Sequence, residues 1–254
     1  MINREKVISQ FRCYVDRFDQ TMNGVQLKYV HSLRVSALCE EIADSLRMSV
    51  ADRDIAWLIG VLHDIGRFEQ LRTYHTFVDY RSIDHAKYGA KYLFDDGHIT
   101  DFLADRKNDE VIFLAISQHN AYELRNDLTP RQRLFCQIIR DADKLDIFRV
   151  YVMYMQQGIP IWHTGETDLK TQSVSQAVLE QVRKRKLVRT QDKKSDIDFY
   201  VGALCFYFDL NYPRSRQLAW EQGYYSKLVS FHSANAASEK ALHEIRQLVY
   251  SDIY

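Results

Sequence analysis

The stretch Leu62-His63-Asp64-Ile65-Gly66-Arg67 follows apolar residues at helical spacing and sets an imidazole directly beside a carboxylate. Side chains of adjacent helical residues point about a quarter to a third of a turn apart. A metal ion near the helix end can therefore meet both side chains. Gly66 is expected to end the helix and let the chain turn away at once. A His-Asp pair is common, so its meaning depends on partners elsewhere in the chain.

Three histidines lie on the apolar stripes of separate predicted helices. His31 extends the stripe of Leu27 and Val35, and His63 and His119 extend similar stripes on two later helices. Each imidazole is therefore expected to face inward. Burying a polar group is costly without a partner, and a shared metal satisfies several groups at once. The alternative is that each is an isolated core histidine bonded to a backbone carbonyl.

A second acidic segment, Asp141-Ala142-Asp143-Lys144-Leu145-Asp146, is the other candidate source of ligands. Asp141 shares a helical stripe with Ile138 and Leu145, whereas Asp143 shares one with Ile139. Either carboxylate can face the core. Spacing alone leaves the choice between them open.

Together these segments resemble the H…HD…D pattern of the HD superfamily of metal-dependent phosphohydrolases. The pattern is carried by His31, by His63-Asp64 and by Ala142-Asp143-Lys144-Leu145. The similarity covers roughly residues 31–148, which is the core of such a domain. It implies that Asp143, rather than Asp141, is the last metal ligand. It also implies an all-α fold.

Binuclear members of that superfamily add two histidines between the HD pair and the last aspartate. The resemblance implies one metal held by His31, His63, Asp64 and Asp143, and a second held by Asp64, His85 and His119. His85 alone could equally be a surface residue at a helix start. The other histidines, expected to be structural or exposed, are His75, His98, His163, His232 and His243.

The sequence predicts a helical chain, because three prolines and nine glycines in 254 residues are few for a fold rich in turns. Helices are expected near 26–47, 49–66, 84–94, 109–121, 130–157, 173–188, 196–210 and 238–250. The polar and aromatic stretch 68–84 is expected to be a long loop. We expect one HD-type helical bundle over 1–254, with its core at about 20–157. A break at Gly158-Ile159-Pro160, followed by mostly polar residues to Gln172, leads into a C-terminal helical extension over 158–254.

Charge and cysteine content exclude several classes of function. The 34 basic residues balance the 34 acidic ones, so neither a membrane nor nucleic acid is an expected partner. The basic run Arg183-Lys184-Arg185-Lys186 with Arg189 is interpreted as a solvated helix face, with binding of nucleic acid or an acidic partner as the alternative. Four widely spaced cysteines indicate reduced thiols rather than disulfides. No signal-like segment opens the chain, which predicts a cytoplasmic protein.

The chemistry that the resemblance implies is attack of a metal-bound hydroxide on phosphorus, because a divalent ion lowers the pKa of its water to about 7. The substrate is expected to be a small phosphorylated metabolite, a nucleotide above all. The ligand set suits one or two ions of iron, manganese, zinc, nickel or cobalt. Arg67 is the first expected phosphate contact and Lys144 the second, ahead of Arg34 and Lys87. Asp64, Arg67 and Lys144 are the candidate catalytic residues.

Two alternatives remain open beside the hydrolase. Some relatives of the superfamily use the same ligands in a di-iron oxygenase, and nothing in the sequence separates that chemistry from hydrolysis. A non-catalytic regulatory HD module is the other. Its weakness is that a binding module has no need of a complete ligand set. In the 68–84 stretch, Tyr74, Phe77 and Tyr80 could stack on a substrate ring or simply pack on one another.

Overall fold

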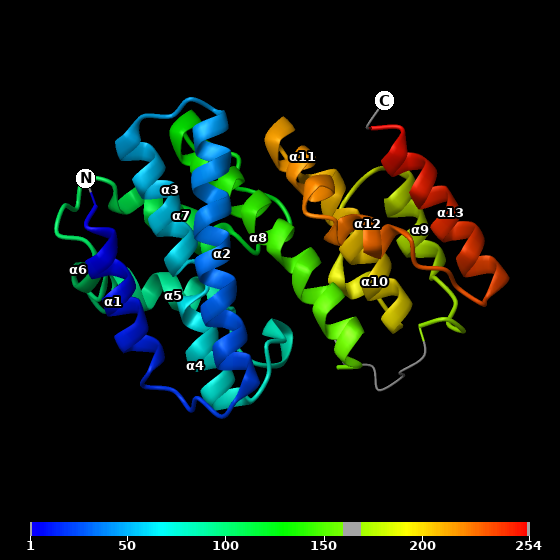
Figure 1. The fold of residues 1–254 in the computed structure, drawn as a ribbon, viewed down its shortest axis with the longest axis horizontal. Coiled ribbons are helices and arrows are strands. Elements are labelled where there is room, and N and C mark those ends of the chain that lie inside the picture. Colours follow the sequence, from blue (N-terminus) through cyan, green and yellow to red (C-terminus); the bar gives the residue numbers. More distant parts are fainter. Residues whose placement is uncertain (1, 160–168, 253–254) are drawn as a thin grey trace. The chain divides into compact units, whose positions relative to one another are not determined.

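The computed structural model describes residues 2–159 and 169–252, and within them the chain is all-α, as the sequence predicted, without a β-strand (Figure 1). The chain forms two compact units, Met1–Asp143 and Lys144–Tyr254. The boundary between them falls inside helix α8, whereas the sequence placed the end of the core near residue 157.

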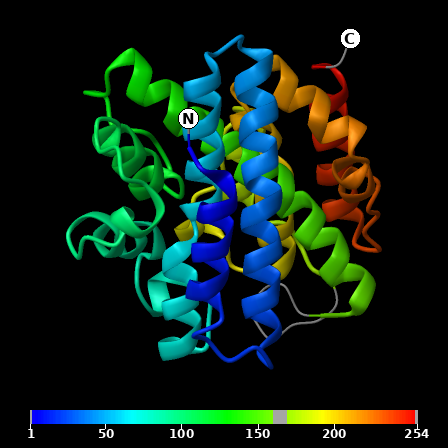
Figure 2. The same cartoon turned by 60° about the vertical axis from the view of Figure 1, so that its left-hand side comes forward.

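Unit 1 holds the HD segment. Its elements are α1 (Arg4–Val15), α2 (Asn23–Ser45), α3 (Val50–Leu62), α4 (Ile65–Tyr74), the 3-10 turn η1 (Asp79–Arg81), α5 (His85–Phe94), α6 (Ile99–Phe102), α7 (Asp109–Gln118) and the first half of α8 (Pro130–Gln157). Helices α2 and α3 pack side by side, as two views of the ribbon show (Figures 1 and 2). A Cβ on Gly60 would lie 2.5 Å from the Cα of Ser36, so only glycine permits this approach.

Several local signals were read correctly from the sequence. The predicted helix 130–157 matches α8, with Pro130 as its first residue. Ser49 caps α3, accepting a hydrogen bond from the Asp52 backbone N–H at 3.1 Å. Asp84 caps α5 in the same way. The predicted break after Gln157 also agrees with the end of α8, where Gly158 has a φ of +65°.

The expected loop over 68–84 was wrong in its first part, because α4 continues to Tyr74. Phe68 and Leu71, three residues apart, are both buried and anchor this helix to the core. The expected role of Gly66 was also wrong. It lies inside α4, and a Cβ there would come 2.3 Å from the backbone oxygen of His85. Gly66 is needed for the close packing of α4 on α5 rather than for a turn.

Unit 2 begins with the second half of α8. Its further elements are α9 (Gln176–Arg183), η2 (Thr190–Asp192), α10 (Asp196–Leu204), η3 (Cys205–Asp209), α11 (Pro213–Glu221), α12 (Tyr224–Val229) and α13 (Ala236–Tyr250). Aromatic side chains fill its core. The rings of Tyr207 and Tyr225 stack with centroids 5.0 Å apart, and the ring centroid of Phe148 on α8 lies 4.7 Å from that of Tyr225. The predicted helix 196–210 is thus α10 continued by a 3-10 turn. Most of the polar stretch predicted before Gln172 lies outside the described residues.

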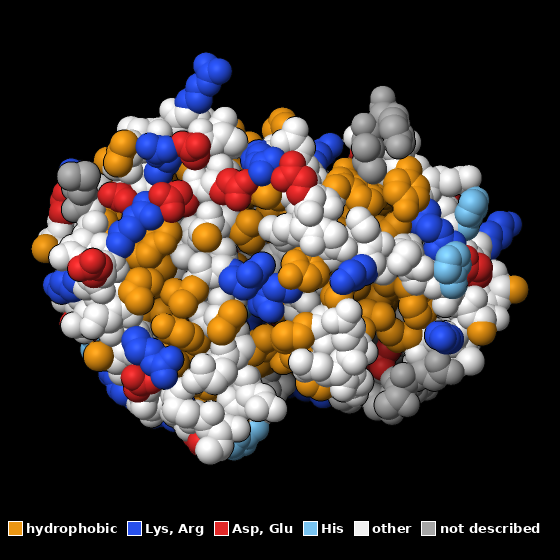
Figure 3. Space-filling model, viewed as in Figure 1, with side chains coloured by type: hydrophobic (Ala, Val, Ile, Leu, Met, Phe, Trp, Pro, Cys, Tyr) orange, Lys and Arg blue, Asp and Glu red, His pale blue; other side chains and the backbone are white. Residues whose placement is uncertain are grey.

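The surface carries charges of both signs. On the face shown in Figure 3, acidic and basic side chains are interspersed among apolar ones. Over residues 2–159 and 169–252, no helix is both long enough and apolar enough to span a membrane.

Candidate metal centre

The His63-Asp64 pair lies where one helix ends and another begins. The His63 backbone N–H still donates to Ile59 O of the α3 ladder at 2.8 Å. Asp64 leaves helical geometry with φ −101° and ψ 16°, and its carbonyl accepts from the Arg67 N–H of α4 at 2.9 Å. The bend between α3 and α4 therefore aims two neighbouring side chains at one point. Sequence spacing alone suggested a single helix ending near Gly66.

The four residues of the predicted first metal position come together. His31 Nε2 of α2 lies 3.0 Å from Asp143 Oδ1 of α8 and 3.5 Å from Asp64 Oδ2. His63 Nε2 lies 3.5 Å from Asp64 Oδ2 and 3.7 Å from Asp143 Oδ1. His31, His63 and Asp64 can each offer one atom to a common ion, with these atoms within 4.8 Å of one another. Three of the four residues are buried, and Asp143 is nearly so.

The residues of the predicted second position surround the other oxygen of Asp64. His85 Nε2 lies 3.3 Å from Asp64 Oδ1, and His119 Nε2 lies 3.6 Å from the same atom. The three form another group with metal-binding spacing. His85 is 1% exposed although it is the first residue of α5, so it is not a surface residue at a helix cap. Asp64 thus stands between the two groups, one oxygen toward each.

The hydrogen bonds of the imidazoles test whether a cation fits here. Nδ1 of His63 faces Gly60 O at 2.8 Å, and Nδ1 of His119 faces Ile116 O at 2.7 Å. Because a carbonyl only accepts, each Nδ1 carries the proton, and each Nε2 of a neutral ring keeps its lone pair. The Nε2 of His63 is buried and has no hydrogen-bond partner among the described residues.

His85 completes this arrangement of acceptors. Its Nδ1 donates to the Asp79 carboxylate, with distances of 2.9 and 2.8 Å to the two oxygens. Its Nε2 lone pair then faces the Nε2 lone pair of His119 at 3.0 Å. Lone pairs and carboxylate oxygens that converge in this way repel unless a cation lies among them. The donor set therefore fits one or two divalent ions with nitrogen and oxygen ligands.

Burial keeps the imidazoles of His63 and His85 in the neutral form that a metal requires. It lowers the pKa of His63, and it lowers that of His85 to about 3, with help from the nearby charge of Arg67. Burial opposes ionisation of Asp64, but the nearby charges of Lys28 and Arg67 hold its pKa well below the ordinary value. Neutral imidazoles and an ionised carboxylate thus coexist near neutral pH.

Two cations flank Asp64. Lys28 Nζ lies 2.6 Å from Asp64 Oδ2, and Arg67 Nε lies 3.5 Å from Asp64 Oδ1. Both side chains also approach the ring of Phe77, at 5.4 and 5.8 Å from its centroid. Arg67 was predicted from the sequence, whereas Lys28 was not. The signal was available, since Lys28 lies three residues before His31 on the same face of α2.

The loop after α4 supplies a second residue that the sequence analysis missed. The Asp79 carboxylate accepts from His85, from Arg67 Nη1 at 2.8 Å and from Gln70 Nε2 at 2.9 Å. Asn120, next to His119, donates to it at 3.1 Å. No helical periodicity marks this position, so the pattern of apolar residues carried no signal for it.

The other predicted substrate contacts have different surroundings. Lys87 is largely exposed and pairs with Asp84 at 3.0 Å. Lys144 is buried and pairs with Asp209 at 3.0 Å. Arg34, three residues after His31 on α2, is exposed.

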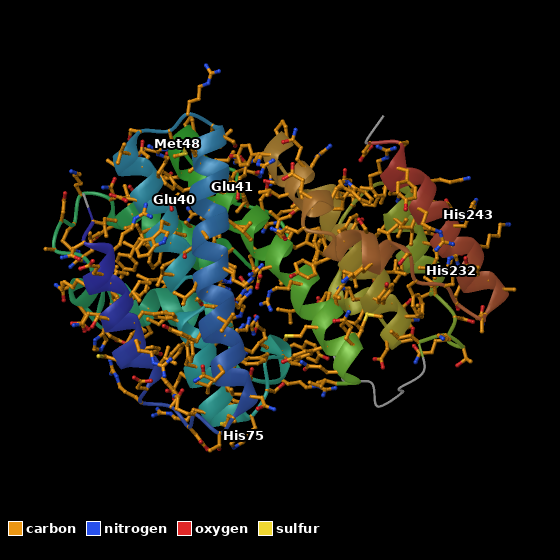
Figure 4. All side chains as sticks on the ribbon, in the orientation of Figure 1. Glu40, Glu41, Met48, His75, His232 and His243 are labelled. Carbon is orange, nitrogen blue, oxygen red and sulfur yellow. The ribbon has the colours of Figure 1, made fainter. Side chains whose placement is uncertain are left out.

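Histidines outside the six predicted ligands are spread over the two units. Figure 4 shows His75 at the end of α4, and His232 and His243 beside or on α13. His98 stacks on Tyr92, with ring centroids 4.1 Å apart, and His163 lies outside the described residues. The basic run is exposed but is not the predicted helix face, because α9 ends at Arg183. Arg183 pairs with Glu244, and Arg185, beyond the helix, pairs with Asp252.

Comparison with known proteins identifies the region that carries this site. Residues 29–147 match the model of the HD domain, so the chain carries an HD domain over the residues that the resemblance indicated. Domains of this family are in general metal-dependent hydrolases. The matched range contains all six predicted metal ligands. Neither the curated proteins nor the solved structures include a significant match to the chain.

Proposed function

We propose that this chain is a metal-dependent phosphohydrolase that cleaves a phosphoester of a small phosphorylated metabolite, with nucleotides as the first class to test. The observation that carries the proposal is the convergence of unprotonated Nε2 atoms on both oxygens of Asp64, with two cations alongside. A site of this charge pattern suits an anionic substrate held beside divalent ions.

The proposed ligands are those of the two groups around Asp64. One ion would be held by His31, His63, Asp64 and Asp143, and the other by Asp64, His85 and His119. Bound divalent ions supply a water of lowered pKa as nucleophile and positive charge for a phosphoryl group. Asp64 stays ionised because its pKa is held low, so it can serve both positions at once.

Arg67 is proposed as the main phosphate contact. Its Nη1 is occupied by Asp79, by Gln70 and by Phe77 O, which fixes the guanidinium in place. Its Nε is buried without a hydrogen-bond partner among the described residues and faces the centre. Because its guanidinium is already fixed, the Nε–H of Arg67 can donate to an anionic oxygen of a substrate without a prior movement of the side chain.

Lys28 is proposed as the second phosphate contact. It is a flexible cation whose ammonium already lies at the centre, 2.6 Å from Asp64. The Phe77 ring beside both cations offers a flat apolar surface for a substrate ring. Lys87 and Lys144 are supported less well, because they pair with Asp84 and Asp209, which are not among the proposed metal ligands.

The direct test is a screen of phosphorylated compounds with protein loaded in turn with iron, manganese, zinc, nickel or cobalt, scored by release of inorganic phosphate. We expect release with at least one metal and none after chelation. Release that continues under nitrogen supports hydrolysis. Oxygen uptake with an organic substrate, without phosphate release, would instead establish the oxygenase alternative. Asp64→Ala is the control for contaminating phosphatases and is expected to be inactive.

A further inference from the structure

The loop between α4 and α5 connects the two kinds of group that the proposed reaction needs. Asp79, the first residue of η1, accepts hydrogen bonds from His85 and from Arg67. His85 belongs to one metal group, and Arg67 is the proposed phosphate contact. A single carboxylate therefore holds a metal ligand and a substrate-binding cation at fixed positions relative to each other.

We propose that Asp79 is a positioning residue that builds the second metal position and aligns Arg67 with it. This inference rests on the proposed two-metal centre. Asp79 acts on that centre through His85, because accepting the Nδ1 proton directs the Nε2 lone pair toward Asp64 and makes the imidazole a better ligand.

The carboxylate itself is held firmly enough for this role. Gln70 of α4 is fully buried, and its Nε2 donates to Asp79 Oδ1 at 2.9 Å, to Ser82 Oγ at 2.8 Å and to Ile83 O at 3.1 Å. This amide ties the loop to the helix that carries Arg67. Asn120 donates to the other oxygen of Asp79 at 3.1 Å. Both oxygens are thus engaged from separate elements.

The negative charge of Asp79 also suits its two partners, which are the N–H donors of Arg67 and His85. Arg67 Nη1 lies 2.8 Å from Asp79 Oδ1, and His85 Nδ1 lies 2.8 Å from Asp79 Oδ2. Hydrogen bonds that a carboxylate accepts from such N–H groups are stronger than those accepted by a neutral amide oxygen. An amide at this position would keep the shape and lose the charge.

Asp79→Asn tests the proposal, with Asp84→Asn as its matched control. Asp84 lies on the same loop and bonds to the same Asn120, but it caps α5 rather than binding Arg67. Asparagine also caps helices well, so the control is expected to be mild. The probe is cobalt titrated into chelator-stripped protein, followed by calorimetry and by the visible absorption of each bound ion.

We expect two binding events in the wild type and in Asp84→Asn. In Asp79→Asn, one event is expected to weaken by roughly 10- to 100-fold, as for other residues that orient metal ligands, while the other stays within about twofold. His85→Ala is expected to weaken the same event, and Asp79→Asn added to it should have little further effect. Asp79→Glu restores the charge at a shifted position and is expected to recover part of the affinity.

Several results would overturn the proposal. These are two unchanged binding events in Asp79→Asn, equal weakening of both, additive effects with His85→Ala, or a wild type that binds a single ion. The titration requires no turnover, so its outcome is independent of the substrate. A protein that shows the expected metal pattern and hydrolyses no phosphoester would retain this inference while losing the proposed function.

Discussion

The ammonium of Lys28 lies 2.6 Å from Asp64 Oδ2, the same oxygen that His31 and His63 approach to 3.5 Å. Lys28 thus places a positive charge on the carboxylate that is also proposed to bind a divalent ion. An ion held by Asp64 would compete with Lys28 for this oxygen, and the ammonium would then be available to a phosphate.

Lys28→Met is therefore expected to tighten metal binding and weaken catalysis at once. Removing a unit positive charge beside a divalent ion removes an electrostatic repulsion of about 1–2 kcal/mol in a solvent-like dielectric. This corresponds to metal binding that is tighter by roughly tenfold. The measurements are the dissociation constant for manganese or cobalt and kcat/KM for the substrate. Lys91→Met is the control, since Lys91 pairs with Asp96 at the surface. Weaker metal binding in Lys28→Met would contradict the competition.

Arg67→Ala is expected to lower kcat/KM by roughly 100-fold, because its N–H is a directed donor to the anionic substrate. Metal content should change far less than turnover. Arg72→Ala, on the exposed side of the same helix, is the matched control and should keep nearly full activity. Equal losses in the two variants would show that Arg67 acts through the stability of α4 alone.

The buried imidazoles predict how the stability of the metal-stripped protein depends on pH. Burial lowers the pKa of His85 to about 3, whereas in the unfolded chain it is near 6.5. Between these values the unfolded chain binds a proton that the folded protein excludes, so the free energy of unfolding falls as the pH drops below about 6.5. The slope from His85 alone is about 1.4 kcal/mol per pH unit.

This slope can be measured by urea unfolding at several pH values between 5 and 8 in the presence of a chelator. His85→Gln removes the titrating group and is expected to flatten the profile relative to the wild type. Parallel profiles for the two proteins would mean that His85 is not held neutral in the fold.

Gly66→Ala is expected to destabilise the protein by about 1–3 kcal/mol or more, since the new Cβ would come 2.3 Å from His85 O. Because the clash pushes α4 from α5, metal binding that depends on His85 should weaken as well. Gly97→Ala meets no atom within 4 Å and should leave metal binding intact, although its positive φ costs some stability. Wild-type metal affinity in Gly66→Ala would disprove the link between this packing and the site.

Asp143→Asn is expected to lose far more bound metal and activity than Asp141→Asn. The Asp143 carboxylate lies 3.0 Å from His31 within the centre. Asp141 is buried two residues earlier, so its side chain points about 200° around the helix from that of Asp143. Metal analysis of the two purified variants makes the comparison, and the reverse order would show that Asp141 is the ligand.

The all-α fold and the inward-facing imidazoles of His31, His63 and His119 could be predicted from local signals, whereas the full set of six ligands came from the family resemblance. Helical stripes placed the imidazoles inward, and Ser49 and Pro130 mark helix starts by their own chemistry. The features that could not be predicted from the sequence depend on long-range packing. The sequence predicts a helix end at Gly66, whereas the structure shows that this glycine allows α5 to pack closely on α4. Asp79 lies in a loop, where no apolar periodicity marks it. The choice of Asp143 over Asp141 came from the family resemblance, because each of them lies on an apolar stripe of α8.

The central claim, that these helices assemble a metal centre around Asp64, is tested most directly by metal analysis of wild type and Asp64→Ala. Both proteins would be stripped with chelator, reloaded with manganese or cobalt, and measured for bound ions per chain alongside their circular dichroism. We expect two ions in the wild type, none or nearly none in Asp64→Ala, and the same helical spectrum in both. A wild type that binds no metal, or an Asp64→Ala variant that keeps its full complement, would contradict the account.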